Sequence, residues 1–220
     1  MNRPKFDILN GMEKRENTNE IRQNAVLEYW FGDLKEGEAP SDDVIAKWWG
    51  KDQETDDYIR ENFGRDLEEA EKGGLSRWEE TPRGTLALII VLDQFSRNVY
   101  RDDPRAFAQD GRALEAAMTG IAKGFDKGLH PVMRVFFYMP FMHSEDIAMQ
   151  EKSLDLFRSL ENEFSQIPDV SEMLSGNRDY AERHYEIVKR FGRYPHRNRI
   201  LGRESKPEEI EFLKQPGSSF

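Results

Sequence analysis

One stretch constrains this chain more than any other: the segment from Thr81 to Pro104, TPRGTLALIIVLDQFSRNVYRDDP. Thr81 and Pro82 form a helix-start pattern, because threonine can cap the first backbone N–H groups and proline suits the first helical position. Residues 86–92 are all apolar, which is typical of a helix buried on every side. Because no second long β-rich run exists to pair with it, we interpret the stretch as a central helix rather than a strand.

Charged residues follow this apolar run before the helix ends. Asp93 and Arg97 are four positions apart, so they continue one buried face, and Gln94 and Asn98 lie beside them. A carboxylate and a guanidinium at the end of a buried helix are costly unless they are paired or bind something. The sequence therefore indicates a polar site here. A purely structural ion pair that pins the C-terminal loop remains the alternative.

Composition narrows the class of protein. The chain is 37% hydrophobic and 34% charged, a balance that favours a helical protein with solvated outer faces over a β-sandwich. The absence of cysteine excludes disulfides, thiolate catalysis and Cys-ligated metal centres. The net charge of −10 argues against nucleic-acid and anionic-membrane partners.

Other signals point to a cytoplasmic protein that lacks a cofactor. No apolar run approaches the ~20 residues that span a bilayer, and residues 1–19 lack the apolar core of a signal peptide. The chain has no Walker loop, no GxGxxG and no HExxH pattern. We therefore predict a cytoplasmic protein with no membrane partner, no metal and no cofactor.

Apolar residues recur at helical spacing through the rest of the chain, and turn residues separate these segments. Every element that we can assign is helical, so we predict an all-α fold of antiparallel helix pairs. Residues 1–19 are expected to form a flexible N-terminal arm and residues 20–220 a single all-helical domain. Besides the central helix, we expect one helix from near Thr18 to Gly32. Further helices are expected over 41–49, 52–72, 104–124, 131–140, 144–164, 177–191 and 205–213.

Three local features refine this interpretation. Pro140 is expected to close its helix, and Ser144 to cap the next one. Capping boxes are expected at Ser76 with Glu79, around a short turn that carries Trp78, and at Ser205 with Glu208. Residues 165–176 are interpreted as a linker or surface loop.

Two histidines are candidates for chemistry. His143 is followed by Glu145 and Asp146, where it could serve as a general base or a metal ligand. His196 precedes Arg197 and Asn198 in a loop, and loops that hold such groups together are more often sites than core. Joined in space to Asp93 and Arg97, these groups would form a polar pocket.

The segment from 178 to 203 contains eight basic residues against three acidic ones. This basic segment could dock onto the acidic helices at 52–72 and 144–163. Alternatively, some of its arginines recognise a phosphate or carboxylate, for which the guanidinium fork is suited.

Four segments carry a resemblance to a known family: VLEYWFG (26–32), PRGTLALIIVLDQFSRNVYRDDPRAFAQD (82–110), HPVMRVFFYMPFMHSEDIAMQEKSLDLF (130–157) and HYEIVKRFGRYPHRNRILGRESKPEEIEFL (184–213). Together they resemble the bacterial "domain of unknown function 924" family over nearly the whole chain after residue 20. Lys206 stands where the family commonly has threonine, which weakens any role for a hydroxyl there.

The resemblance implies an all-helical fold similar to the tetratricopeptide-like α-α superhelix, and it implies no established activity. The distinctive positions of the family coincide with the polar residues singled out above. They are Asp93, Gln94, Arg97, Asn98, His143, Glu145, Arg193, His196, Arg197 and Asn198.

Two functions follow as hypotheses. In the first, a pocket binds a small anionic metabolite; in its catalytic version His143 or His196 is the acid or base and Asp93 its orienting group. The ligand-binding residues would be Gln94, Arg97, Asn98, Glu145, Arg193, Arg197 and Asn198. The second is a binding scaffold for a protein or peptide partner. Its contact surface would be drawn from Trp30, Trp48, Trp49 and Trp78. The adjacent pair at 48–49 is interpreted first as an anchor against the core, and the floor of a ligand pocket is the alternative.

Overall fold

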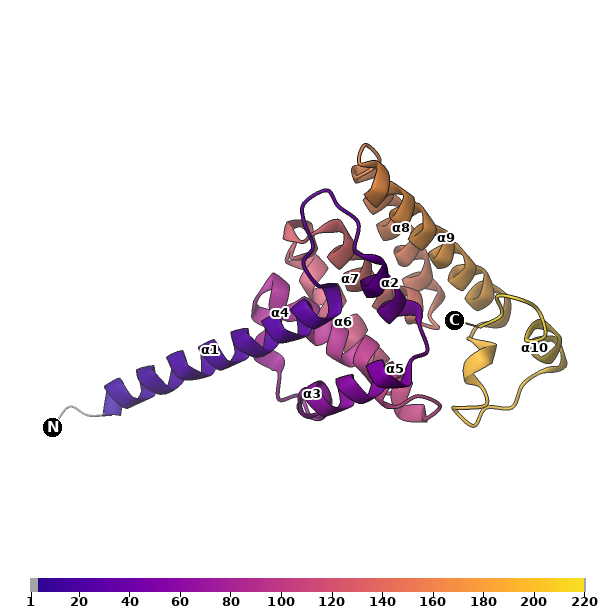
Figure 1. The fold of residues 1–220 in the computed structure, drawn as a ribbon. Coiled ribbons are helices and arrows are strands. Elements are labelled where there is room, and N and C mark those ends of the chain that lie inside the picture. The colour runs from indigo at the N-terminus through magenta and orange to yellow at the C-terminus, as the bar shows by residue number, and fades with distance from the viewer. Residues whose placement is uncertain (1–3, 220) are drawn as a thin grey trace.

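The computed structural model describes the backbone of residues 4–219 and the side chains of residues 18–219. Helices make up this part of the chain, and it contains no strand (Figure 1). The α-helices are α1 (Pro4–Phe31), α2 (Asp42–Trp49), α3 (Gln53–Glu71), α4 (Pro82–Ile89), α5 (Ser96–Val99), α6 (Asp110–Ala122), α7 (Pro131–His143), α8 (Ile147–Glu163), α9 (Pro168–Phe191) and α10 (Pro207–Phe212). Short 3-10 helices are η1 (Ser76–Glu80), η3 (Pro104–Phe107), η4 (Asp126–Gly128) and η5 (Pro195–Arg197).

The all-α prediction is confirmed, and the helices pack as a compact array in which α8 and α9 form an antiparallel pair (Figure 1). The finer prediction of a tetratricopeptide-like superhelix stays a prediction. None of the helices in the described part combines the length and hydropathy that crossing a bilayer needs.

Helix α4 lies at the centre, in contact with α1, α6 and α7. Thr81 caps it as expected, because its Oγ1 accepts a hydrogen bond from the backbone N–H of Gly84. Residues 86–92 are all buried, which confirms the interpretation of that run. Aromatic rings extend this core: Trp30 lies edge-on to Phe95 and Phe136, with centroids 5.5 and 5.8 Å away.

A π-helix, η2 (Ile90–Phe95), joins α4 to α5. The sequence pattern predicted an uninterrupted α-helix here, because i→i+5 hydrogen bonding leaves no mark on apolar periodicity. π-Helical turns are rare and are found often at functional sites. This one carries Asp93 and Gln94, and Arg97 follows it one turn later.

Pro140 does not close its helix, contrary to the sequence-based expectation. Helix α7 continues through Pro140 to His143, so that histidine stands at a helix C-terminus and not before an N-terminus. The cost of the missing backbone hydrogen bond, about 3 kcal/mol, is outweighed by burial, since nearly every side chain of α7 lies in the core. Asp146, rather than Ser144, caps α8 by accepting from the N–H groups of residues 148 and 149.

The expected loop at 165–176 is wrong, because α9 already begins at Pro168. Pro168 at the first position and Asp169 in the first turn are helix-start signals, which the many small polar residues of this stretch obscured. Val170 and Leu174 are buried, so this first part of α9 packs onto the core.

Smaller differences occur at other helix ends. The C-terminal capping box is shifted by one residue, since the N–H of Lys206 donates to Glu209 Oε2 at 2.7 Å. Trp78 lies in a short turn as expected, but no side chain caps η1. The helix expected over 104–124 is divided into η3 and α6.

Helix α1 begins at Pro4, well before the start expected near Thr18. Residues 1–3 of the predicted arm lie outside the described residues. The division into an arm over 1–19 and a single domain over 20–220 stays a prediction.

Gly120 sets how closely α6 approaches α7, and this generates a prediction. A Cβ at position 120 would lie 2.5 Å from Cζ of Phe137, a fully buried ring, and 3.2 Å from Cγ2 of Thr85. We expect Gly120→Ala to lower the free energy of unfolding by about 1–3 kcal/mol, because overpacking outweighs the better helix propensity of alanine. Urea unfolding measures the change.

The matched control is Gly64→Ala in α3, where no atom lies within 4 Å of the added Cβ. It should raise the free energy of unfolding by about 0.5–1 kcal/mol. Equal stability of the two alanine variants would show that the contact between α6 and α7 can accommodate an added methyl group without strain.

Candidate functional site

A cluster of polar side chains lies at the end of the central helix, and Asp93 is at its centre; its role as a functional site stays a prediction. Asp93 is fully buried. Its Oδ1 accepts a hydrogen bond from His143 Nδ1 at 2.8 Å and lies 3.1 Å from an Nη atom of Arg97. Gln94 donates to the other carboxylate oxygen, and Arg97 also donates to the backbone carbonyl of Asp93.

The charge state of Asp93 follows from these contacts. Burial alone would raise its pKa, but Arg97 and His143 act in the opposite direction and hold the pKa of this carboxyl well below its usual range. An ionised carboxylate can only accept hydrogen bonds, so Nδ1 of His143 must carry a proton. Nε2 is thereby left to accept a proton, or to donate one when the ring is charged.

Two arginines from distant parts of the chain share Asp110. Arg97 and Arg197 each donate to Asp110 Oδ2 at 3.2 Å. The guanidinium of Arg197 lies between two rings, 4.6 Å from the centroid of Phe107 and 4.5 Å from that of Tyr194. This stacking fixes the plane of the guanidinium and connects η5 to η3 and α6.

Arg197 is in an unfavourable environment for a cation. Its side chain is only 8% exposed, and its Nε is buried without a hydrogen-bond partner in the described part of the chain. Burial lowers the pKa of Arg197, and the charge of Arg97 lowers it further, while Asp110 opposes both. An arginine stays protonated nonetheless, so its Nε–H is a buried donor without a hydrogen-bond partner among the described residues.

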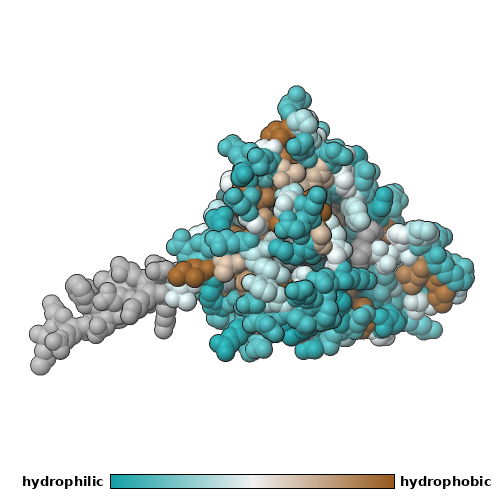
Figure 2. Space-filling model, viewed as in Figure 1, coloured by the Kyte–Doolittle hydropathy of each residue, from teal (hydrophilic) through white to brown (hydrophobic). Residues whose placement is uncertain are grey.

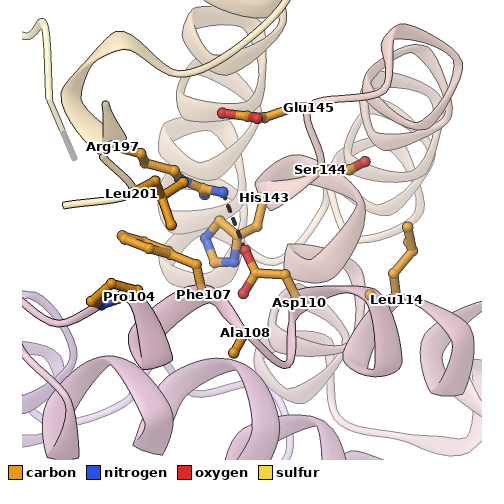
Figure 3. Close-up of a pocket in the computed structure, with 11 residues that line it drawn as sticks. Pro104, Phe107, Ala108, Asp110, Leu114, His143, Ser144, Glu145, Arg197 and Leu201 are labelled. Atoms are coloured by element: carbon orange, nitrogen blue, oxygen red, sulfur yellow. Dashed lines mark hydrogen bonds and ion pairs between the residues drawn. The ribbon is translucent and has the colours of Figure 1, made fainter. Parts of the chain in front are cut away.

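Asp110, His143 and Arg197 line a cavity of about 470 Å³, whereas Asp93, Gln94 and Arg97 are not among its lining residues. This volume is within the range of small-molecule sites. Figure 3 shows Arg197, His143 and Asp110 directed toward one another from η5, α7 and α6. The lining residues are Pro104, Phe107, Ala108, Asp110, Gly111, Leu114, His143, Ser144, Glu145, Arg197 and Leu201.

Glu145 lies on the same cavity but its oxygens are occupied. Both accept from Arg203, at 2.6 and 2.9 Å, and Oε1 also accepts from the backbone N–H of Tyr194 at 2.8 Å. Burial would raise the pKa of Glu145, yet Arg203 and the Tyr194 hydrogen bond lower it below its usual value. This ion pair fixes the C-terminal loop over the cavity.

The other predicted site residues are distributed over different clusters. Asn98 donates to Asp56 at 2.8 Å, on the side facing α3. Arg193 donates to both oxygens of Glu209, at 2.7 and 2.8 Å, and Asn198 donates to the same carboxylate at 3.3 Å. These three side chains hold helices and loops together, and a role for them in ligand binding stays a prediction.

His196 packs beside Tyr194, with ring centroids 5.5 Å apart, and it is not among the residues that line the cavity. Burial and the nearby charge of Arg197 lower the pKa of His196 to about 4, so its ring is neutral at physiological pH. Of the two candidate histidines, His143 is therefore the one that lines the cavity.

Sequence reasoning did not single out Asp110, Phe107 or Arg203. Asp110 was visible only as the last residue of a segment that resembles the family, in an otherwise ordinary first helical turn. No local pattern shows that two arginines 100 positions apart converge on one carboxylate.

The tryptophans divide into buried and exposed sets. Trp30 and Trp78 are buried, and Trp48 Nε1 donates to the carbonyl of Trp30 at 2.8 Å, so these three belong to the core. Trp49 is 56% exposed and lines a second cavity, of about 320 Å³, between α2, α7 and α9. On the face seen in Figure 2, hydrophilic residues cover most of the surface, and apolar atoms form small separate patches.

Comparison with known proteins supports the resemblance. The family model described as "Bacterial protein of unknown function (DUF924)" matches residues 26–217. A solved structure, "Protein of Unknown Function ATU0120 from Agrobacterium tumefaciens", is similar with a TM-score of 0.75 and 33% sequence identity, over 89% of this chain and 98% of that one. No curated protein matches.

Asp93→Asn tests the electrostatic account of the site. Removing this buried charge leaves Arg97 with Asp110 alone, and we expect a loss of about 3–5 kcal/mol in the free energy of unfolding at pH 7. The pKa of Asp93 is lower in the folded state than its unfolded value near 4. Its stabilisation is therefore complete above that value, and the gap between variant and wild type should narrow as the pH falls below about 4.

Urea unfolding at several pH values measures this. Asp57→Asn, at a half-exposed surface ion pair with Arg60, is the control and should change stability by less than about 0.5 kcal/mol. If the difference in unfolding free energy between wild type and Asp93→Asn grows as the pH falls, Asp93 is protonated in the native state.

Proposed function

The chain belongs to the DUF924 family of bacterial proteins, whose description assigns no activity, and we propose from the geometry of the site that the cavity beside His143 binds a small anionic metabolite. The observation that carries this proposal is the Asp93–His143 hydrogen bond of 2.8 Å at the wall of a cavity that Arg197 also lines.

Anion binding is supported by the state of Arg197. Its guanidinium is stacked between two rings, is nearly buried, and uses one nitrogen on Asp110 while Nε has no partner within the described residues. A planar guanidinium held in this way is pre-organised for the two oxygens of a carboxylate or phosphate, and little side-chain entropy remains to be lost on binding.

Proton transfer is the chemistry that the pair supports. Asp93 holds the His143 ring in one tautomer and stabilises its charged form, as the carboxylate of a Ser-His-Asp triad does. No hydroxyl of the described residues forms a hydrogen bond with His143, so a covalent serine mechanism has no support. We propose that His143 exchanges a proton with the bound molecule as general acid or base.

A binding scaffold is the second candidate, and one observation favours it. Trp49 and Tyr180 are 56% and 47% exposed, and they line the second cavity with their rings nearly parallel and 6.2 Å apart. The buried positions of Trp30 and Trp78 remove half of the contact surface proposed for it. We therefore rank this function second.

A thermal-shift screen tests the first proposal against phosphate, nucleotides, sugar phosphates, and mono- and dicarboxylates. The chain offers a variant that fills the cavity: Gly111 lines it, and a Cβ added there would meet no atom within 4 Å. We expect one class of anion to stabilise the wild type, by about 2.7 kcal/mol at 100 times its Kd, and Gly111→Leu to abolish that shift.

The matched control is Gly64→Leu, at an equally open position on α3 that does not line the cavity. It should keep the full ligand-induced shift. If no anion stabilises the wild type, or if Gly111→Leu responds as the wild type does, the cavity is not an anion site and the scaffold function takes its place.

A further inference from the structure

The formal charges around the cavity balance one another. Three cations are present, on Arg97, Arg197 and Arg203, and each is in contact with a carboxylate. The carboxylates number three as well: Asp93, Asp110 and Glu145. An incoming anion therefore meets no surplus positive charge as long as the His143 ring is neutral.

Proton uptake can supply the missing positive charge, and the groups that face His143 show where the proton would be held. Asp93 from η2 contacts its Nδ1; His184 from α9 lies with its ring 6.2 Å away; and Asp110, Glu145 and Arg197 share the cavity wall with it. Arg97 and Tyr194 complete the surroundings through Asp93 and Arg197.

The other two histidines of this cluster do not compete for the proton. Burial lowers the pKa of His184 well below its usual value, and burial with Arg197 lowers that of His196 to about 4. Both rings are therefore neutral at pH 7. His143 is also the ring that forms a hydrogen bond with the buried carboxylate of Asp93.

Much of the rest of the cavity is apolar. Pro104, Phe107, Leu114 and Leu201 contribute to its lining, and Figure 3 shows Phe107, Pro104 and Leu201 grouped on the side of Arg197. Hydroxyl-rich molecules such as sugar phosphates would lose hydrogen bonds with water here and gain few in return. An apolar body is the better match for these walls.

We propose that the ligand of this site is a small monocarboxylic acid with an apolar body, which binds as its carboxylate together with one proton on His143. This inference rests on the proposed function and narrows it. The carboxylate lies between the Arg197 guanidinium and Nε2–H of His143, and the apolar body contacts Phe107 and Leu201. A dianion would bring one negative charge more than the site can neutralise.

Three probes with one common ring test this inference: phenylacetate, phenylacetamide and phenyl phosphate. They differ in charge, because the amide is neutral and the phosphate ester carries close to two negative charges above pH 7. Each is titrated into the ¹⁵N- and ¹³C-labelled protein at several pH values, and Kd is taken from the NMR shifts of residues that line the cavity.

We expect phenylacetate to bind at least tenfold more tightly than the other two probes. Its Kd should decrease as the pH falls from 8 to 6, by at most tenfold per pH unit, which is the limit for one proton taken up per ligand. By linkage, bound phenylacetate should also move the pH titration of the His143 Cε1–H resonance to higher pH. That last readout needs no variant.

The His143→Gln variant should lose the pH dependence: its Kd for phenylacetate should change by less than twofold between pH 8 and pH 6. The matched control is His130→Gln, at the opposite end of α7 and outside the lining of the cavity, which should keep the pH dependence of the wild type. Circular dichroism verifies that both variants are folded.

Two kinds of result overturn the inference and leave the anion site of the previous subsection standing. One is binding of phenyl phosphate as tight as that of phenylacetate, and the other is a phenylacetate Kd that does not change with pH. Equal binding of the neutral amide and the carboxylate overturns both proposals. Failure of all three probes to bind at millimolar concentration overturns the inference, and the screen with Gly111→Leu then decides the proposed function independently.

Discussion

The ionised carboxylate of Asp93, removed completely from solvent, is the constraint on which the site depends. A buried charge is tolerated only if it is paired and hydrogen-bonded, and Asp93 meets this condition through Gln94, Arg97 and His143. Those partners come from η2, α5 and α7, so one group fixes how the central helix meets its neighbour. The arrangement continues through Arg97 to Asp110 and on to Arg197, and in this way the C-terminal loop is tied to the core.

Much of the fold follows from sequence patterns, and the exceptions have physical causes. Thr81 marks a helix start correctly, because a cap is a local interaction between neighbouring residues. The helix end predicted at Pro140 was wrong because burial of α7 in the core outweighed the tendency of proline to end a helix. The start of α9 was missed because its short apolar stripe lies among polar residues. The π-helix could not be predicted, since its extra residue per turn does not disturb a run that is apolar throughout.

The kinds of chemical group in the candidate site could be predicted from the sequence, but not the full set of residues that supply them. Buried helix-end positions singled out Asp93 and Arg97. In the structure Asp93 contacts His143, and Arg97 shares Asp110 with Arg197. Asn98, Arg193 and Asn198 are also polar and lie within four positions of Arg97 or Arg197 in the sequence, yet they contact other carboxylates. Adjacent helical positions point about 100° apart, so neighbours in the sequence are directed at different partners.

The π-helix also determines how far the residues after it are rotated about the axis of the central helix, relative to those before it. One residue more than an α-helical turn requires rotates everything that follows by about 100° about the axis. The apolar side chains of α4 and the polar side chains of α5 therefore point in different directions about the helix axis than an unbroken α-helix would give them. The backbone between the two helices is nevertheless continuous. The length of this segment, and not only the identity of its residues, decides that the carboxylate of Asp93 turns toward α7. In this family a gap or insertion between positions 90 and 95 would thus change the direction of the site without changing any of its residues.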